Sequence, residues 1–185
     1  MVPRRDAQRN RELLLESARD AFAGHTGPSP VSLEAVARAA GLGIGTLYRH
    51  FPTREALVEE VYRTELAAVC ASAAPLLERM RPDRALRVWM DRYGDFVQAK
   101  RGMAETLRVL LNAGLAGAGE TRQRVRATVA LLLDRGADAG LLRDDIAADD
   151  VVVSLIGVFL ATAEASDRDQ AGRMLDLLVD GLRSH

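Results

Sequence analysis

Apolar residues recur three or four positions apart along almost the whole chain, which is the spacing of one face of an α-helix. A clear stripe is formed by Leu33, Val36, Ala37 and Ala40. Aromatic residues make up only 4% of the chain and runs of β-branched residues are few, so an all-α fold is predicted. The pattern predicts about nine helices, at about residues 9–23, 33–40, 44–51, 53–79, 83–100, 102–112, 120–139, 151–163 and 168–183.

The most informative stretch runs from Ser32 to Glu55 and reads as two short helices joined by a glycine turn, followed by the start of a third. Ser32 is predicted to cap the first helix, because a serine oxygen accepts an unpaired backbone N–H. Gly41 ends that helix, since glycine tolerates the left-handed conformation. Pro52 ends the second helix, and Thr53 caps the third. The arrangement fits a helix-turn-helix, although a helical hairpin in an ordinary bundle would show the same periodicity.

The second of these helices carries the candidate DNA contacts. Its buried face consists of Leu47 and Phe51. Small residues at its beginning would let the backbone approach base edges in a major groove: Gly43, Gly45 and Thr46. Donors that suit backbone phosphates follow: Tyr48, Arg49, His50 and Arg54. The sequence therefore predicts that this helix reads DNA.

The run GTLYRHF at residues 45–51, followed by TREAL at residues 53–57, resembles the DNA-binding end of TetR-type transcriptional regulators. The resemblance covers about residues 9–66 and is much more specific than a general helix-turn-helix pattern. It implies base or groove contacts for Ile44, Gly45 and Thr46, and phosphate contacts for Tyr48, His50 and Arg54. Ser32 and Arg49 complete the DNA-binding candidates.

Two positions depart from the family pattern. Many relatives have Ser or Thr where this chain has Gly43, and a polar residue where it has Ile44. Gly caps a helix more weakly than Ser does. Ile44 can contact a thymine methyl group, but it cannot make a bidentate base contact. The bases that are read therefore do not follow from the resemblance.

Charge is distributed unevenly along the chain. The formal charge is +3 up to Arg54 and −4 from Glu55 onward. This asymmetry favours an anionic partner at the N-terminal end, although an excess of this size is also common in segments that bind nothing. Residues 1–10 are polar and are expected to form a disordered arm. Arg4 and Arg5 in that arm are hypothesised to add phosphate or minor-groove contacts.

The domain prediction is a DNA-binding domain at residues 1–52 and a regulatory and dimerisation domain at residues 53–185. Pro75 interrupts an otherwise helical pattern, so it should either kink that helix or begin a new one. The order of residues from Asp83 to Ala104 resembles the SbtR-type C-terminal half of the TetR family.

The last two predicted helices have two possible roles. Residues 151–163 carry no charge, yet the run is too short to span a membrane, so it is expected to be buried all round. The pair could form the interior of the fold or half of a four-helix dimer interface. TetR-like proteins pair through their last two helices, so the resemblance implies an interface formed by Val152, Leu155, Phe159, Leu175, Leu178 and Leu182.

The regulatory domain is expected to contain an effector site. Bulky side chains are the candidates to line it: Trp89, Tyr93, Phe96, Met103, Leu107 and Phe159. A stripe of aromatic and Met residues at helical spacing is more often part of the hydrophobic core than the lining of a pocket. Nothing in the sequence identifies the ligand.

No motif supports an enzyme. The sequence has no glycine-rich phosphate loop, nucleophile signature or metal-ligand spacing, and its single cysteine, Cys70, cannot form an internal disulfide. No cofactor or metal is predicted, and a cytoplasmic location is expected. We interpret the chain as a homodimeric repressor that binds a double-stranded DNA operator and is released by a small-molecule effector. A helical protein-interaction module, or a small-molecule-binding protein that does not read DNA, remains the alternative.

Overall fold

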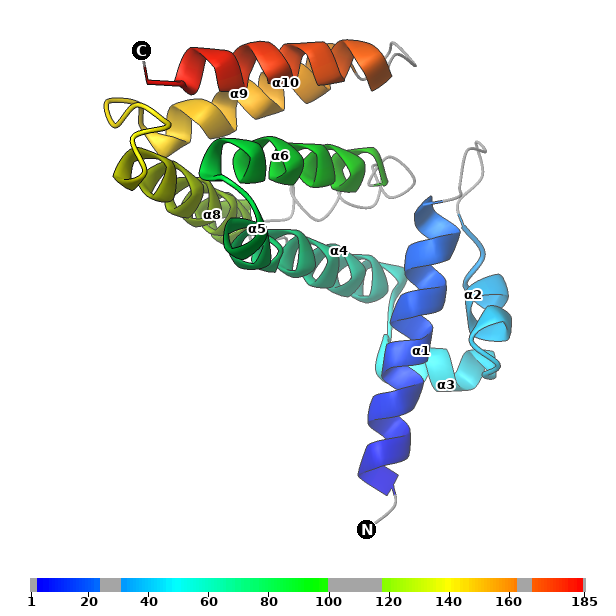
Figure 1. Ribbon diagram of the computed structural model, residues 1–185. Helices are drawn as coiled ribbons and strands as arrows, with labels where there is room; N and C mark the ends of the chain where they lie inside the picture. Colours follow the sequence, from blue (N-terminus) through cyan, green and yellow to red (C-terminus); the bar gives the residue numbers. More distant parts are fainter. Residues whose placement is uncertain (1–2, 24–30, 100–117, 163–167, 185) are drawn as a thin grey trace. The chain divides into compact units, whose positions relative to one another are not determined.

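The computed structural model describes residues 3–23, 31–99, 118–162 and 168–184, and these residues form helices (Figure 1). No strand occurs within these ranges; Leu142 and Arg183 make one isolated bridge. The all-α prediction is therefore confirmed. The helix predicted at residues 102–112 lies outside the described part. The helices are α1 (Pro3–Ala23), α2 (Leu33–Ala39), α3 (Ile44–His50), α4 (Arg54–Ala71), α5 (Ala73–Arg79), α6 (Pro82–Ala99), α8 (Ala118–Asp138), α9 (Ala148–Ala161) and α10 (Arg168–Leu182).

Residues 3–10 of the N-terminal arm are helical, so the prediction of disorder was wrong for this part. Helix α1 begins at Pro3 and carries Asp6 in its first turn. Proline suits the first position of a helix, where its missing N–H would be unpaired in any case, and an acid in the first turn complements the helix dipole. One turn further on, the Gln8 amide donates to Glu12 at 2.8 Å. These local signals outweigh the low hydrophobicity of the segment.

The turn between α2 and α3 is built as predicted. The Ser32 hydroxyl accepts the Ala35 N–H at 3.3 Å and thereby caps α2. Gly41 has a φ of 70°, which non-glycine residues rarely adopt. The Gly41 N–H bonds the Arg38 carbonyl at 3.0 Å and the Leu42 N–H bonds the Ala37 carbonyl at 2.9 Å. This pair of bonds is the Schellman pattern, which pairs the last carbonyls of a helix.

The described residues divide into two compact units, with boundaries inside α4, between Glu65 and Leu66, and near the end of α6, between Val97 and Gln98. In the first unit, α1, α2 and α3 pack against one another. Their shared core also includes the first turns of α4. The buried members are Leu14, Ala18, Phe22, Val31, Leu33, Val36, Ala37, Leu47, Phe51, Leu57, Val58 and Val61. The domain boundary predicted at residues 52–53 stays a prediction.

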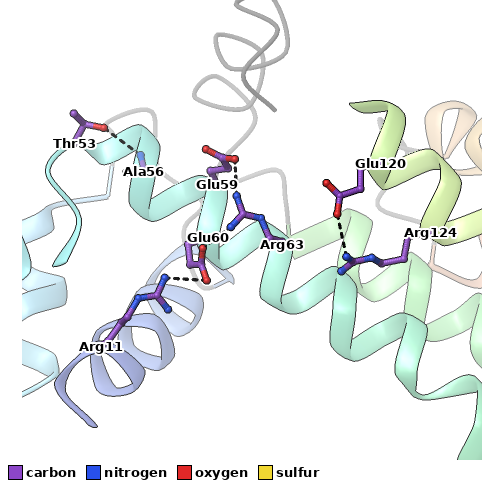
Figure 2. Close-up of polar contacts among 8 residues, drawn as sticks. All are labelled: Arg11, Thr53, Ala56, Glu59, Glu60, Arg63, Glu120 and Arg124. Atoms are coloured by element: carbon purple, nitrogen blue, oxygen red, sulfur yellow. Dashed lines mark hydrogen bonds and ion pairs between the residues drawn. The ribbon is translucent and has the colours of Figure 1, made fainter. Parts of the chain in front are cut away.

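Helix α4 starts and stops for local reasons. The Thr53 hydroxyl accepts the Ala56 N–H at 3.1 Å, which is the predicted cap (Figure 2). The helix ends at Ala71, and α5 begins at Ala73, after Ser72. Pro75 in the first turn of α5 has no N–H with which to pair the Ala71 carbonyl. A new helix therefore begins here, which is one of the two predicted outcomes.

The second unit has an aromatic centre. Helix α9 packs against α8 and α10, and the ring of Phe159 on α9 meets α6 at Gly94, where an added Cβ would lie 2.7 Å from the ring. Trp89 is fully buried and its indole N–H donates to the Val69 carbonyl at 3.1 Å. Its ring stacks on Tyr93 at a centroid distance of 5.5 Å. These contacts join α4, α6 and α9.

Replacing Trp89 with Ala is expected to lower the free energy of unfolding by about 3–5 kcal/mol, the cost of removing a large buried aromatic side chain. Trp89→Phe keeps a ring but loses the indole hydrogen bond. The Val69 carbonyl still accepts from the Ser72 N–H and hydroxyl, so the cost beyond the lost volume should be at most about 1 kcal/mol. Urea unfolding followed by circular dichroism measures both changes. A loss below about 1 kcal/mol for Trp89→Ala would contradict the central position of this side chain.

Candidate nucleic-acid interface and effector region

Helix α3 has one buried and one exposed face. Leu47 has no exposed surface, and Phe51, which follows the helix, is 2% exposed. On the outer face Gly45, Tyr48 and Arg49 are exposed, and Tyr48 keeps 47% of its surface. A large, half-exposed aromatic residue beside a cation suits contacts with a nucleic-acid backbone. The predicted contact residues thus share the solvent side of one short helix, and Thr46 and His50 lie at its partly exposed edges.

The beginning of α3 is bare backbone. Gly43 is the N-cap residue, and no side chain accepts the first backbone N–H groups of the helix there. An added Cβ at Gly43 or Gly45 would meet no heavy atom within 4 Å, and both residues are exposed. Packing inside the protein therefore does not require glycine at either position. A surface without side chains permits the close approach of backbone to a ligand.

Two predicted contacts also have structural roles. Ile44 is half-buried and packs against the core of the first unit, so only part of its side chain is available to a thymine methyl group. The Ser32 hydroxyl caps α2 and donates to the Glu34 carboxylate at 2.9 Å. Two hydrogen bonds lower the pKa of Glu34: the larger effect comes from a backbone N–H and the next from the Ser32 hydroxyl.

Arg54 lies at the start of α4 and is half-buried. Its guanidinium donates to the backbone carbonyl of Val31, immediately before the capping residue of α2. Arginine has five N–H donors in a fixed fork, so this bond leaves others for a phosphate. The side chain therefore links α4 to the start of the helix-turn-helix in addition to its predicted role.

The predicted effector residues form a buried aromatic cluster in the second unit. Tyr93 lies 6.0 Å from Phe96 and 6.0 Å from Phe159 between ring centroids, and it stacks on Trp89. All four side chains are buried. The structure brings these residues together, and they contact one another as a core does. Met103 and Leu107 lie outside the described residues.

The predicted interface residues mostly face the interior of their own chain. Val152, Leu155, Leu175 and Leu182 are at most 3% exposed, and Leu178 is half-buried. Phe159, which is also in the predicted set, contacts Tyr93. The prediction that residues 151–163 are buried on all sides was wrong for the single chain, because a second apolar stripe on this segment is exposed. Its members on the two helices are Val153, Ile156 and Leu160 of α9 and Met174 and Leu177 of α10.

That second stripe has a signal in the sequence. Val153, Ile156 and Leu160 are separated by three and four positions, so they share a face of α9. Leu160 and Leu177 keep 70% and 66% of their surface exposed. Several exposed large apolar side chains on neighbouring helices are unusual for a monomeric protein. A helix that is apolar all round carries two stripes, and only one of them can face the core of the same chain.

The second unit also has a surface groove of about 420 Å³ between α8 and residues 143–148. Ala130 and Leu133 contribute to its apolar lining, and Arg126 and Asp134 are among its polar residues. Arg143, which lines the groove, donates two hydrogen bonds to Asp145, and Arg122 on α8 donates two to Asp149 on α9. These bonds lower the pKa of both carboxyl groups. Among the predicted effector residues that the structure describes, none lines this groove.

Helices α2 and α3, with the supporting α1 and α4, form a helix-turn-helix, and a separate helical unit follows. This arrangement defines a helix-turn-helix DNA-binding protein with a helical C-terminal domain. Residues 14–61 match the family described as bacterial regulatory proteins, tetR family, and residues 81–184 match the SbtR-like C-terminal domain of transcriptional regulators. The chain therefore belongs to the TetR family of DNA-binding transcriptional regulators.

Solved structures agree with this assignment. A TetR transcriptional regulator from Streptomyces coelicolor is 43% identical, with a TM-score of 0.81 over 94% of this chain and 98% of that one. A TetR regulatory protein from Mycobacterium vanbaalenii is 32% identical, with a TM-score of 0.73 over 98% and 99% of the two chains. A transcriptional regulator from Cytophaga hutchinsonii, at 18% identity, shares the fold with a TM-score of 0.75 over 94% and 98%. A comparison with curated proteins finds no match.

No helix in the described part of the chain is both long enough and apolar enough to cross a membrane.

Proposed function

We propose that the protein is a homodimeric repressor that binds a specific DNA operator and is released from it by a small-molecule effector. The observation that carries the DNA-reading part is the outer face of α3, where the bare backbone of Gly43 and Gly45 adjoins exposed Tyr48 and Arg49. Backbone without side chains suits close approach to base edges, and the polar side chains beside it suit phosphates.

The exposed stripe of α9 and α10 supports the homodimer. Its five large apolar side chains are exposed on the last two helices, which pack against each other and through which members of the family pair. A symmetric dimer buries the same patch on both subunits, so a second copy of this chain covers the stripe. The inward-facing residues predicted from sequence would then support the two helices from below.

Two-fold symmetry sets the geometry of the operator. Two copies of α3 must enter successive major grooves on one side of the duplex, about 34 Å apart, which is one turn of B-DNA. The operator should therefore be a pseudo-palindrome. A conformation with a different spacing would bind it less tightly.

The effector is proposed to bind in the C-terminal unit, against the aromatic cluster of Trp89, Tyr93, Phe96 and Phe159. An effector that binds more tightly to a conformation with the wrong α3 spacing lowers DNA affinity. By linkage, DNA lowers effector affinity by the same factor. The mechanism needs no chemistry on the ligand.

Selection of duplexes from a random DNA library at a stated, near-physiological salt concentration tests the proposal. We expect enrichment of a pseudo-palindromic sequence whose half-sites are centred about one helical turn apart. Affinity for that sequence should exceed affinity for random duplex by about 10³-fold or more. A protein that enriches no sequence, with or without added cell extract, would instead fit the helical interaction module considered above.

A further inference from the structure

The side chain of Arg11 on α1 joins three elements of the N-terminal unit. Its guanidinium carbon lies 5.1 Å from the centroid of the Phe51 ring. One of its nitrogens lies 3.0 Å from a carboxylate oxygen of Glu60 on α4 (Figure 2). Phe51 is the C-cap residue of α3, and its N–H donates to the Leu47 carbonyl at 2.8 Å. One cation therefore contacts both the end of the candidate reading helix and the helix that follows it.

Partial burial strengthens both contacts. The side chains of Arg11 and Glu60 keep only 34% and 21% of their surface, and Phe51 keeps 2%. A partly shielded ion pair is screened less by salt than an exposed one, and a cation gains more from an aromatic face when water is excluded. A planar guanidinium can stack on a ring and pair with a carboxylate at once, which a lysine ammonium does less well.

The partner carboxylate is itself held in place. Glu60 also accepts a bond from Arg63 at 2.8 Å, and Arg63 pairs in turn with Glu59 at 2.7 Å. Figure 2 shows Glu60 turned toward Arg11, with the Glu59–Arg63 pair on the same helix. Contacts with α4 therefore restrain the position of the Arg11 guanidinium, and the guanidinium in turn restrains the Phe51 ring that it stacks on.

Helix α4 thus holds the helix-turn-helix at both ends. At the beginning, Arg54 donates to the Val31 carbonyl next to the cap of α2. At the end, Glu60 acts through Arg11 on Phe51. The apolar core between these points restrains α3 through side-chain packing, which is non-directional, whereas the two polar contacts are directional and add a restraint on its orientation.

We propose that Arg11 is a positioning residue that sets the direction of α3 for operator recognition without contacting DNA. The inference rests on the proposed function. A reading helix that is misdirected by a few degrees loses base contacts, which require close geometry, before it loses the sequence-independent attraction to phosphates. The discrimination between operator and random duplex is therefore the property that Arg11 controls.

The test compares Arg11→Gln with Arg19→Gln in the full-length protein. Arg19 is a matched control, because it also lies on α1 and pairs with a glutamate of α4, Glu65, at 3.9 Å, yet among the described residues its cation lies over no aromatic ring. Each variant is titrated with the selected operator and with a random duplex over a range of salt concentrations, and its melting temperature is recorded. We expect Arg11→Gln to weaken operator binding about tenfold or more while leaving random-duplex affinity and the salt slope unchanged. Arg19→Gln should change none of these.

Other results overturn the proposal in distinct ways. A fall in the slope of log affinity against log salt by about 0.9, with weaker binding to both duplexes, would make Arg11 a direct phosphate contact. Unchanged discrimination, with or without a lower melting temperature, would leave Arg11 with a purely structural role. In the supporting outcome, Arg11→Lys restores part of the discrimination, and Glu60→Gln combined with Arg11→Gln costs less than the two single losses together. If the wild type itself enriches no operator, the proposed function fails first, and this inference fails with it.

Discussion

Replacing Leu160 and Leu177 together with Glu is expected to convert the protein into a monomer and to abolish tight operator binding. These side chains keep 70% and 66% of their surface in the single chain, so the substitutions should not disturb the fold. In a symmetric dimer each charge appears twice and loses its water without gaining a partner, at about 3–5 kcal/mol. The dimer dissociation constant should rise by about 10²–10³-fold or more. A monomer also loses the effective concentration that links two half-sites, worth about 10²–10⁴ in affinity.

Sedimentation equilibrium and operator titration measure the two effects. Leu131→Glu is the control, because Leu131 is a partly exposed leucine on α8, with 38% of its surface free, and lies outside the stripe. It should stay dimeric. A double variant of unchanged mass would place the interface elsewhere. Leu155→Glu, at a side chain with no exposed surface, should instead unfold the chain, which separates the outer stripe from the inner one.

The local features of the fold could be predicted from the sequence because each depends on a few neighbouring residues. Ser32, Thr53 and Gly41 are recognised by what their own backbone positions require, and the structure has all three in those roles. The break near Pro75 follows from a missing donor. Such signals do not require knowledge of what packs against the helix.

The partner of each helix face could not be predicted in the same way. Every turn of residues 151–163 is apolar, so the pattern carries no information about which stripe meets α8 and α10. The choice depends on the complementary surfaces, including Gly94, which makes room for the Phe159 ring. The long-range polar contacts were missed for a related reason. Arg11 and Glu60 are separated by many residues, and only the packing of α1 against α4 brings them together.

The candidate DNA contacts fall between these cases. The motif at residues 45–51 indicates which helix reads DNA, and burial on the inner side at Leu47 agrees with it. Ile44 and Arg54 show the limit of carrying a role over by position. Each has a second, structural contact in this chain, so a loss of DNA binding on changing either residue would have two possible causes. A residue whose added side chain would meet nothing inside the protein gives a cleaner test.

Gly45 is such a residue, and Gly45→Leu is expected to weaken operator binding by about 10²-fold or more without reducing stability. An added Cβ meets no heavy atom within 4 Å, and leucine is a better helix former than glycine. The new side chain projects from the exposed surface at the start of α3, where close approach to the base edges is proposed. The loss of about 1–3 kcal/mol at each half-site is incurred twice in a dimer.

A size series separates this steric effect from changes in the fold. Gly45→Ala should have an intermediate effect on operator affinity, and thermal unfolding of both variants should occur at or above the wild-type temperature, since helix propensity rises. Ala68→Leu, at an exposed position on α4, adds similar bulk away from α3 and should leave DNA binding unchanged. Full operator affinity in Gly45→Leu would mean that the beginning of α3 does not approach DNA closely. The reading surface would then have to be assigned to Tyr48 and Arg49 in the last turn of the helix, where side chains reach the duplex from a greater distance.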